Sequence, residues 1–279
     1  MSYLRPHRLD AALAELARAP YLVVAGGTDV YPAHVGRAIE RSILDISALD
    51  AMRGVSDANG ALRIGALTTW SEIARRPLPR HCAALAQAAR EIGGRQIQNR
   101  GTIGGNLCNA SPAADGIPPL LALDAAVELV SAAGARRLPL AQFVLGNRRT
   151  ACRPDELLAA VIVPPRSQAA VSTFLKLGHR RYLVISIAMV AAVLDFDADD
   201  RVAYCGVAVG ACSAAAQRLP VLEAGLLGVA RREVAARAEA LIDAALAPLS
   251  PIDDVRGTRA YRLEAVRRLL ARLMQEAAA

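Results

Sequence analysis

Apolar and polar positions follow two different periods in the first half of the chain, and these periods predict its elements. Apolar residues recur at helical spacing from Leu9 to Ala19, and the apolar run Tyr21–Val24 that follows is typical of a short buried strand. Further strands are expected at 42–46 and 62–64, and further helices at 69–75 and 81–91. This alternation predicts an α/β arrangement.

The pattern changes at Val163-Pro164-Pro165-Arg166-Ser167-Gln168, where two adjacent prolines cannot continue a helix or a strand ladder. Beyond this point strand-like runs come first and helical patterns follow, at 173–177, 184–194, 202–209, 231–246 and 261–276. Strands that precede helices predict an antiparallel sheet covered on one face. We therefore expect an α+β protein of two domains, with boundaries at 1–166 and 170–275.

The composition is that of a globular protein. The chain has 279 residues, of which 54% are hydrophobic, and this suffices for two buried cores. No apolar run approaches the ~20 residues that a membrane span needs, and the segment Met1–His7 lacks the apolar core of a signal peptide. We expect a cytoplasmic protein with no membrane span.

The formal net charge of +7 at pH 7 is compatible with an acidic partner or a nucleic acid. The arginines are scattered in pairs through predicted helices, however, and aromatic residues make up only 4% of the chain. Binding of single-stranded nucleic acid combines a basic groove with aromatic side chains for base stacking. Solvated helix faces explain the charge better, so no nucleic-acid partner is predicted.

The residues that usually hold metals or attack substrates show no functional spacing. The five cysteines are odd in number and lack a C-x-x-C pair, which predicts free thiols. Cys108 is expected to be buried and to pack in a core, as free cysteines usually do. The four histidines have no metal-ligand spacing, and no Ser-His-Asp arrangement is visible. We predict no metal site and expect a cofactor to carry the chemistry.

Two glycine pairs lie in segments of similar design, Ala25-Gly26-Gly27-Thr28-Asp29-Val30 and Thr102-Ile103-Gly104-Gly105-Asn106. Glycine permits positive φ and close approach, so consecutive N–H groups can converge on a phosphate oxygen. Thr28 and Thr102 each add a hydroxyl, and Thr28 is expected to cap a following helix. Together the segments predict one site for a dinucleotide diphosphate, although each alone is also compatible with an ordinary tight turn.

The common nucleotide motifs do not account for these glycines. The sequence contains no G-x-G, which excludes the Rossmann fingerprint, and no glycine is followed by Lys-Ser or Lys-Thr as in a P-loop. A different nucleotide-binding fold is therefore required.

The glycine segments and several others resemble the FAD-binding medium subunit of molybdenum hydroxylases. This family includes the flavoprotein subunits of carbon monoxide dehydrogenase, bacterial xanthine dehydrogenase and 4-hydroxybenzoyl-CoA reductase. The other matching segments are Arg63–Thr69, Gln96–Gly101, Ala110–Asp115 and Ser250–Gly257, so the resemblance covers nearly the whole chain. The inserted loop that carries an extra iron–sulfur cluster in the reductase subunits is absent from this sequence.

The resemblance implies a fold and a cofactor. The fold would be α+β: a two-lobed α/β FAD-binding domain of the PCMH type, followed by a domain in which a three-stranded antiparallel sheet packs on helices. The implied cofactor is FAD. The residues implied to bind it are Val23, Val24, Ala25, Gly26, Gly27, Thr28, Asp29, Val30, Thr102, Ile103, Gly104, Gly105, Asn106, Ser111, Asp115 and Lys176.

Three charged residues of this implied site, Asp29, Asp115 and Lys176, have different expected roles. A carboxylate repels a diphosphate, so Asp29 is expected to accept hydrogen bonds from backbone N–H groups near a helix start. Asp115 is implied to contact the ribityl or adenosine side of the cofactor, but it is also compatible with a turn cap after Pro112. Lys176 is the only lysine among 33 basic residues, and the resemblance places it near the flavin.

Three apolar residues are also implied to lie near the flavin. Ile92 matches a position beside the cofactor, and either Val184 or Ile185 is expected against the isoalloxazine ring. Packing in a core strand would explain Val184 and Ile185 equally well.

The resemblance also implies a role in electron transfer. The subunit would pass electrons from the two [2Fe-2S] clusters of a small subunit through FAD to an external acceptor, such as a quinone or NAD. A large molybdopterin-binding subunit would oxidise the substrate, and the complex would be a dimer of heterotrimers. Two other interpretations are a stand-alone FAD-dependent oxidoreductase of the same superfamily and a cofactor-free assembly protein, which would leave the glycine pairs without a purpose.

Overall fold

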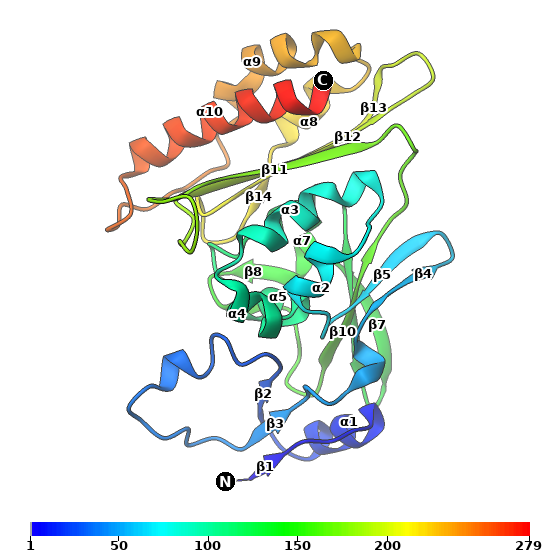
Figure 1. Ribbon diagram of the computed structural model, residues 1–279, viewed down its shortest axis with the longest axis vertical. Helices are drawn as coiled ribbons and strands as arrows, with labels where there is room; N and C mark the ends of the chain where they lie inside the picture. The colour runs from blue at the N-terminus through cyan, green and yellow to red at the C-terminus, as the bar shows by residue number, and fades with distance from the viewer. Residues whose placement is uncertain (1) are drawn as a thin grey trace.

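The computed structural model describes residues 2–279, which form an N-terminal part of two lobes and a C-terminal part stacked on the second lobe (Figure 1). The chain begins at the bottom of Figure 1, in the first lobe, and ends at the top, in the last helix. The fold is α+β, as predicted. Within residues 2–279, no helix combines the length and the apolar character that crossing a membrane requires.

The first lobe is a three-stranded parallel sheet with one helix. The strand order is β1 (Tyr3–Leu4), β3 (Ile43–Asp45) and β2 (Leu22–Val24), and the helix is α1 (Leu9–Arg18). Because its apolar residues recur at helical spacing, α1 buries Ala12, Leu13 and Leu16 on one face. Strand β2 ends directly before the first glycine pair, and the long connection to β3 extends to one side of the molecule in Figure 1.

The second lobe is built on a five-stranded antiparallel sheet. Its strands, in spatial order, are β4 (Val55–Ala58), β5 (Ala61–Gly65), β10 (Leu157–Val163), β6 (Ala126–Ser131) and β7 (Gly134–Pro139). Strand β10 is central, and all seven of its residues are buried because both faces of the sheet are covered there. The helices of this lobe are α2 (Trp70–Arg75), α3 (Ala83–Glu91), α4 (Arg95–Arg100), α5 (Ile103–Asn109), α6 (Ile117–Ala122) and α7 (Leu140–Phe143).

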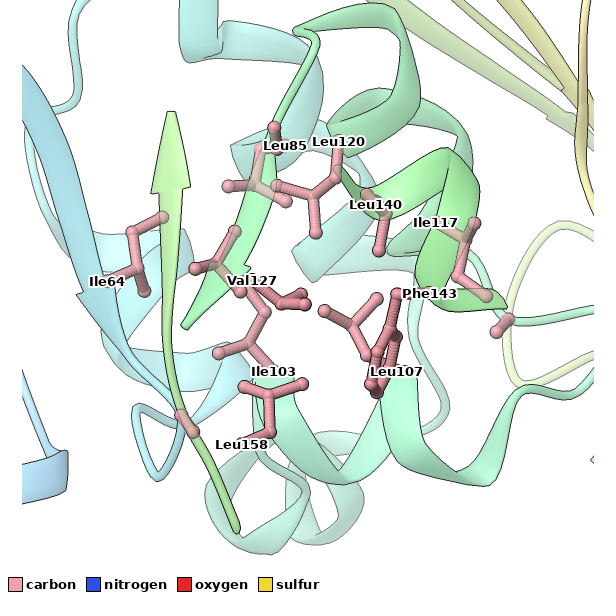
Figure 2. Packing of buried hydrophobic residues seen from close by; sticks show 14 of the residues in the cluster. Ile64, Leu85, Ile103, Leu107, Ile117, Leu120, Val127, Leu140, Phe143 and Leu158 are labelled. Atoms are coloured by element: carbon pink, nitrogen blue, oxygen red, sulfur yellow. The ribbon is translucent and has the colours of Figure 1, made fainter. Parts of the chain in front are cut away.

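The core of the second lobe fixes the helix that carries the second glycine pair. Ile103 and Leu107 of α5 are fully buried, and Figure 2 shows both side chains in the same core as Val127, Phe143 and Leu158. A short hairpin of β8 (Val144–Gly146) and β9 (Arg149–Thr150) lies beside the end of α5. The sheet and this core therefore set the position of α5.

The C-terminal part is an antiparallel sheet between two sets of helices. Its strands are β11 (Val171–Leu177), β12 (Ala188–Phe196), β13 (Val202–Gly210) and β14 (Gln217–Arg218), and its helices are α8 (Pro220–Leu226), α9 (Val234–Ala245) and α10 (Arg259–Ala278). Helix α10 contacts β11 and β12, while α3 and α6 of the second lobe contact the same sheet. Both faces are covered, so all nine residues of β12 are buried.

Three details of the fold differ from the sequence analysis. The C-terminal sheet has a fourth, two-residue strand, β14, where three strands were predicted. Strand β12 begins at Ala188, so residues 184–187 precede the strand instead of belonging to it. The five-stranded sheet of the second lobe is wholly antiparallel, because β4 and β5 form a hairpin at Asn59-Gly60 and β10 lies antiparallel to both β5 and β6.

Candidate functional site

A cleft of 410 Å³ lies between the two lobes of the N-terminal part. This volume falls within the range of small-molecule sites, about 300–1,000 Å³. The first lobe contributes the segment after β2, and the second lobe contributes residues of α4, α5 and β10. The apolar residues that line the cleft include Tyr21, Val23, Val30, Ile46, Leu67, Trp70, Ile92, Ile97, Leu157 and Leu158.

Both glycine segments line this one cleft, as the sequence predicted. Val23, Ala25–Val30, Thr102, Gly104, Gly105 and Asn106 are all part of its wall. Val24 and Ile103 do not line it, because their side chains are buried in the core. The two segments therefore face one ligand site from different lobes.

The segment Ala25–Val30 presents backbone donors that the protein itself does not use. Within residues 2–279, none of the N–H groups of these six residues donates a hydrogen bond to a protein acceptor. Gly27 is buried and Asp29 is exposed, while the other four residues are half-buried, so a ligand or water can supply the acceptors. Gly27 has φ +72°, a conformation that glycine adopts without strain. This segment is therefore a row of unused donors along the cleft.

Glycine is required at position 26 by the approach of the second lobe. A Cβ placed on Gly26 would overlap the carbonyl oxygen of Arg100, at the end of α4. A Cβ placed on Gly101 would lie 3.5 Å from the hydroxyl oxygen of Thr28. The two lobes thus touch through backbone atoms at the base of the cleft.

The second glycine segment differs from the prediction, because it is the start of a helix and its N–H groups are already used. Thr102 is the N-cap of α5, and its hydroxyl accepts a hydrogen bond from Gly105 N at 3.1 Å. The N–H groups of Ile103 and Gly104 donate to the carbonyl oxygens of Thr68 and Ala66, at 3.0 and 2.8 Å. The prediction that both glycine pairs offer free amides is therefore wrong for the second pair.

The glycines of α5 instead control shape. A Cβ on Gly104 would meet the backbone of Ala66 at 2.8 Å, so Gly104 lets the helix lie against β5 and its following turn. A Cβ on Gly105 would meet only the hydroxyl of Thr102, and Gly105 is exposed on the wall of the cleft. One glycine fits the helix to its lobe, and the other leaves room for a ligand.

Asn106 lines the cleft and carries a buried side-chain oxygen without a partner. Its Oδ1 atom is buried and accepts no hydrogen bond from any of the residues 2–279. A buried acceptor without a partner is unfavourable unless a ligand or water supplies a donor. Asn106 is thus a ligand-binding candidate that the sequence identified.

Two expectations for the first glycine segment are wrong. Thr28 does not cap a helix, since the next helical turn is the 3₁₀ turn Pro32–His34, whose N-cap is Tyr31. The carboxylate of Asp29 is exposed and accepts no hydrogen bond within the described part of the chain. Asp29 therefore points to solvent at the cleft instead of binding backbone N–H groups.

Asp115 and Lys176 form a buried ion pair that does not line the cleft. Lys176 Nζ donates to Asp115 Oδ2 at 2.6 Å and to the Glu91 carbonyl oxygen at 3.2 Å, and Ser186 Oγ donates to Asp115 Oδ1. Burial raises the pKa of the Asp115 carboxyl, and the ammonium of Lys176 opposes that shift. The turn-cap interpretation of Asp115 is therefore wrong, because its carboxylate joins the second lobe to the C-terminal sheet.

Of the remaining residues considered in the sequence analysis, some line the cleft and others lie outside it. Ile92 lines the cleft, whereas Ser111 is half-buried outside it and its hydroxyl accepts from Ala113 N. Val184 and Ile185 lie in the segment before β12 and do not line the cleft either. Cys108 is exposed on the cleft wall, so the prediction that it is buried in a core is wrong.

The turn between β9 and β10 forms part of the rim and was not identified from the sequence. Arg136 donates to both carboxylate oxygens of Glu156, at 2.6 and 2.9 Å, and Arg153 N donates to Glu156 at 2.8 Å. The hydrogen bond from Arg136 holds the pKa of Glu156 below its usual value, against the effect of burial. Cys152, Arg153 and Pro154 of this turn line the cleft. Burial raises the pKa of the Cys152 thiol to about 11, so this thiol is protonated at neutral pH.

Two family models match consecutive parts of the chain. Residues 1–166 match the model described as the FAD binding domain in molybdopterin dehydrogenase. Residues 173–277 match the model described as the CO dehydrogenase flavoprotein C-terminal domain. The cleft and both glycine segments lie within the first match.

Curated relatives show the same relationship over different spans. The xanthine dehydrogenase FAD-binding subunit of Escherichia coli O157:H7 is 32% identical over 100% of this chain and 96% of that protein. The nicotinate dehydrogenase FAD-subunit of Eubacterium barkeri is 35% identical, but the match spans 66% of this chain and 65% of that protein.

Solved structures resemble the whole fold. Carbon monoxide dehydrogenase from Hydrogenophaga pseudoflava matches with a TM-score of 0.90 and 27% identity, over 99% of this chain and 96% of that one. Quinoline 2-oxidoreductase from Pseudomonas putida 86 matches with a TM-score of 0.88 and 26% identity, over 100% and 96%.

Proposed function

Because this chain belongs to the family of FAD-binding medium subunits of molybdenum hydroxylases, we propose that it binds FAD in the interlobe cleft and transfers electrons within a larger oxidoreductase. The observation that carries this proposal is the row of six unused N–H groups at Ala25–Val30, on the wall of the cleft that the first lobe contributes. These donors fit a ligand that has anionic oxygens.

The two walls of the cleft have different tasks in this proposal. Amides of Ala25–Val30 donate to the diphosphate, as unused backbone donors in a glycine-containing turn can. Thr102 and Gly105 supply a wall without a protruding side chain, and the amide side chain of Asn106 lies on the same wall. Ser111, Asp115 and Lys176 stay predicted contacts of the cofactor, carried by the resemblance alone, because they do not line the cleft.

Apolar residues shape the rest of the site. Ile92 and Ile97 provide a half-buried apolar surface on which an aromatic ring system packs while water is excluded, and the buried Trp70 lies behind the wall. Bound FAD supplies the ability to take up electrons singly and release them in pairs. The protein supplies position and surroundings, which agrees with the lack of a nucleophile or an acid pair in the sequence.

The rest of the complex follows from the family. We propose that a small subunit with [2Fe-2S] clusters delivers electrons to this subunit, and that a large molybdopterin-binding subunit oxidises the substrate. The assembly would be a dimer of heterotrimers in the cytoplasm, and the final electron acceptor would be external.

Two measurements test this function. The flavin-free full chain is titrated with FAD while the emission of Trp70 is followed, since Trp70 is the only tryptophan and lines the cleft. Saturation at one FAD per chain with quenched emission is expected, and an unchanged emission together with no retained flavin would contradict FAD binding.

The second measurement addresses the partners. A tagged chain is purified from its native cell, and the preparation is analysed for molybdenum, iron and additional subunits. Co-purification of all three supports the complex. A flavin-loaded chain that is alone and oxidises a substrate would favour the stand-alone oxidoreductase instead.

A further inference from the structure

Arg153 is the single positively charged residue that lines the cleft, considering residues 2–279. It lies in the turn between β9 and β10, in the second lobe, while the unused amides belong to the first lobe. The cleft also contains two acidic residues, Asp29 and Glu156.

The turn that carries Arg153 is held firmly on both sides of this residue. Arg153 N donates to Glu156 at 2.8 Å, and Arg136 donates to Glu156 and to the Ala151 carbonyl oxygen at 2.8 Å. The Glu156 side chain is only 4% exposed. Pro154 adds a fixed φ directly after Arg153. The backbone at Arg153 is therefore restrained at the rim.

The guanidinium of Arg153 has no protein partner. Its side chain forms no ion pair and no hydrogen bond with any other residue among 2–279. Glu156, the acid nearest in sequence that lines the cleft, is hydrogen-bonded by Arg136, and the more distant charge of Arg153 only adds to the lowering of the Glu156 pKa. Asp29 is the other acid of the cleft, and its carboxylate is exposed and not paired with Arg153. Arg153 is thus an exposed, unpaired arginine that lines the cleft, and the unused amides lie on the wall of the other lobe.

We propose that Arg153 binds the diphosphate of the FAD from the second lobe and is a positioning and affinity residue of this site. A guanidinium matches phosphate oxygens with two parallel hydrogen bonds, which a single ammonium cannot do. This inference rests on the proposed FAD binding. It adds the charge that amide dipoles alone do not supply, and it joins both lobes through one ligand.

The test compares Arg153→Gln and Arg153→Lys with the matched control Arg149→Gln. Arg149 is exposed, lies four positions away and does not line the cleft. Dissociation constants of the flavin-free full chain are measured for FAD, ADP and riboflavin, at low and high salt. ADP carries the diphosphate without the flavin, and riboflavin carries the flavin without any phosphate.

Arg153→Gln is expected to raise the dissociation constants for FAD and ADP by roughly tenfold or more, because a charge-assisted hydrogen bond is lost. Riboflavin affinity and melting temperature should be unchanged, and Arg149→Gln should resemble the wild type. Arg153→Lys should be intermediate, and the salt dependence of FAD binding should decrease in Arg153→Gln.

Equal affinities of Arg153→Gln and Arg149→Gln for FAD would overturn the assignment of Arg153. It would also be overturned if Arg153→Gln lost as much affinity for riboflavin as for FAD. A wild-type chain that binds no FAD would overturn the proposed function itself. The two failures are therefore distinguishable, because only the second removes binding from the unmodified chain.

Discussion

Gly26 of the first lobe lies directly against the carbonyl oxygen of Arg100 in the second lobe, so closely that a Cβ on Gly26 would overlap this oxygen. The contact joins the two glycine segments at the base of one cleft. Backbone atoms lie on both sides of this contact. A change of side-chain rotamer therefore cannot remove the overlap that a larger residue at position 26 would cause.

Gly26→Ala should therefore separate the lobes. We expect the free energy of unfolding to fall by about 2 kcal/mol, as for overpacked cores. FAD affinity should fall as well, because the amides of Ala25–Val30 move away from α5. Urea denaturation and FAD titration measure both effects, and a variant with wild-type values in both would refute the close contact.

Gly104 and Gly105 should respond differently to the same substitution. Gly104→Ala should destabilise the protein by about 2 kcal/mol, because its Cβ meets the backbone of Ala66. Gly105→Ala should leave stability nearly unchanged, because the helix preference of alanine over glycine, about 1 kcal/mol, offsets displacement of the Thr102 hydroxyl, which lies 2.9 Å from the new Cβ. Its Cβ would stand on the cleft wall, so FAD affinity should still fall. Thermal unfolding and FAD titration separate the two cases, and a Gly105→Ala variant with undiminished FAD affinity would show that this wall does not touch the cofactor.

Glu156 should make stability depend on pH. The hydrogen bonds from Arg136 lower the pKa of Glu156 in the folded state below the unfolded value of 4.5. Its contribution is therefore fully present above 4.5 and is lost as pH falls through the folded-state pKa. Glu156→Gln should cost about 2 kcal/mol at neutral pH. Urea denaturation should show this difference shrink at acid pH, and a constant difference would exclude the titration of Glu156 as its source.

Asp115 and Lys176 should be energetically coupled. Asp115→Asn leaves a buried ammonium without its carboxylate, and Lys176→Met leaves a buried carboxylate without its ammonium, so each should cost about 3 kcal/mol. The double variant should lose clearly less free energy of unfolding than the two single losses added together, since no charge stays unpaired in it. A double-mutant cycle from urea denaturation measures this coupling, and additive losses would argue against the pair.

The sequence identified those site residues whose role depends only on their own position in the chain. Gly26, Gly27 and Asn106 could be identified because close approach, positive φ and amide chemistry are properties of single positions. The use of the α5 amides could not be predicted, because their acceptors, Ala66 and Thr68, lie more than thirty residues away and reach α5 only in the folded lobe.

The contacts of charged residues could not be predicted either, because they join residues far apart in the sequence. The ion pair of Asp115 with Lys176 joins residues 61 positions apart. Arg153 shows no pattern of its own, since its position depends on the ion pair between Arg136 and the buried Glu156. The strands were easier to predict where both faces are buried, as in β12, than at edges such as β14, where two residues suffice to extend the sheet.

The measurement that tests the central claim most directly is a crystal structure of the full chain with FAD. The account predicts diphosphate oxygens within hydrogen-bond distance of the N–H groups of Ala25–Val30, with the wall at Thr102–Asn106 on the other side of the same cofactor. A diphosphate bound elsewhere, with those N–H groups facing solvent, would contradict the account.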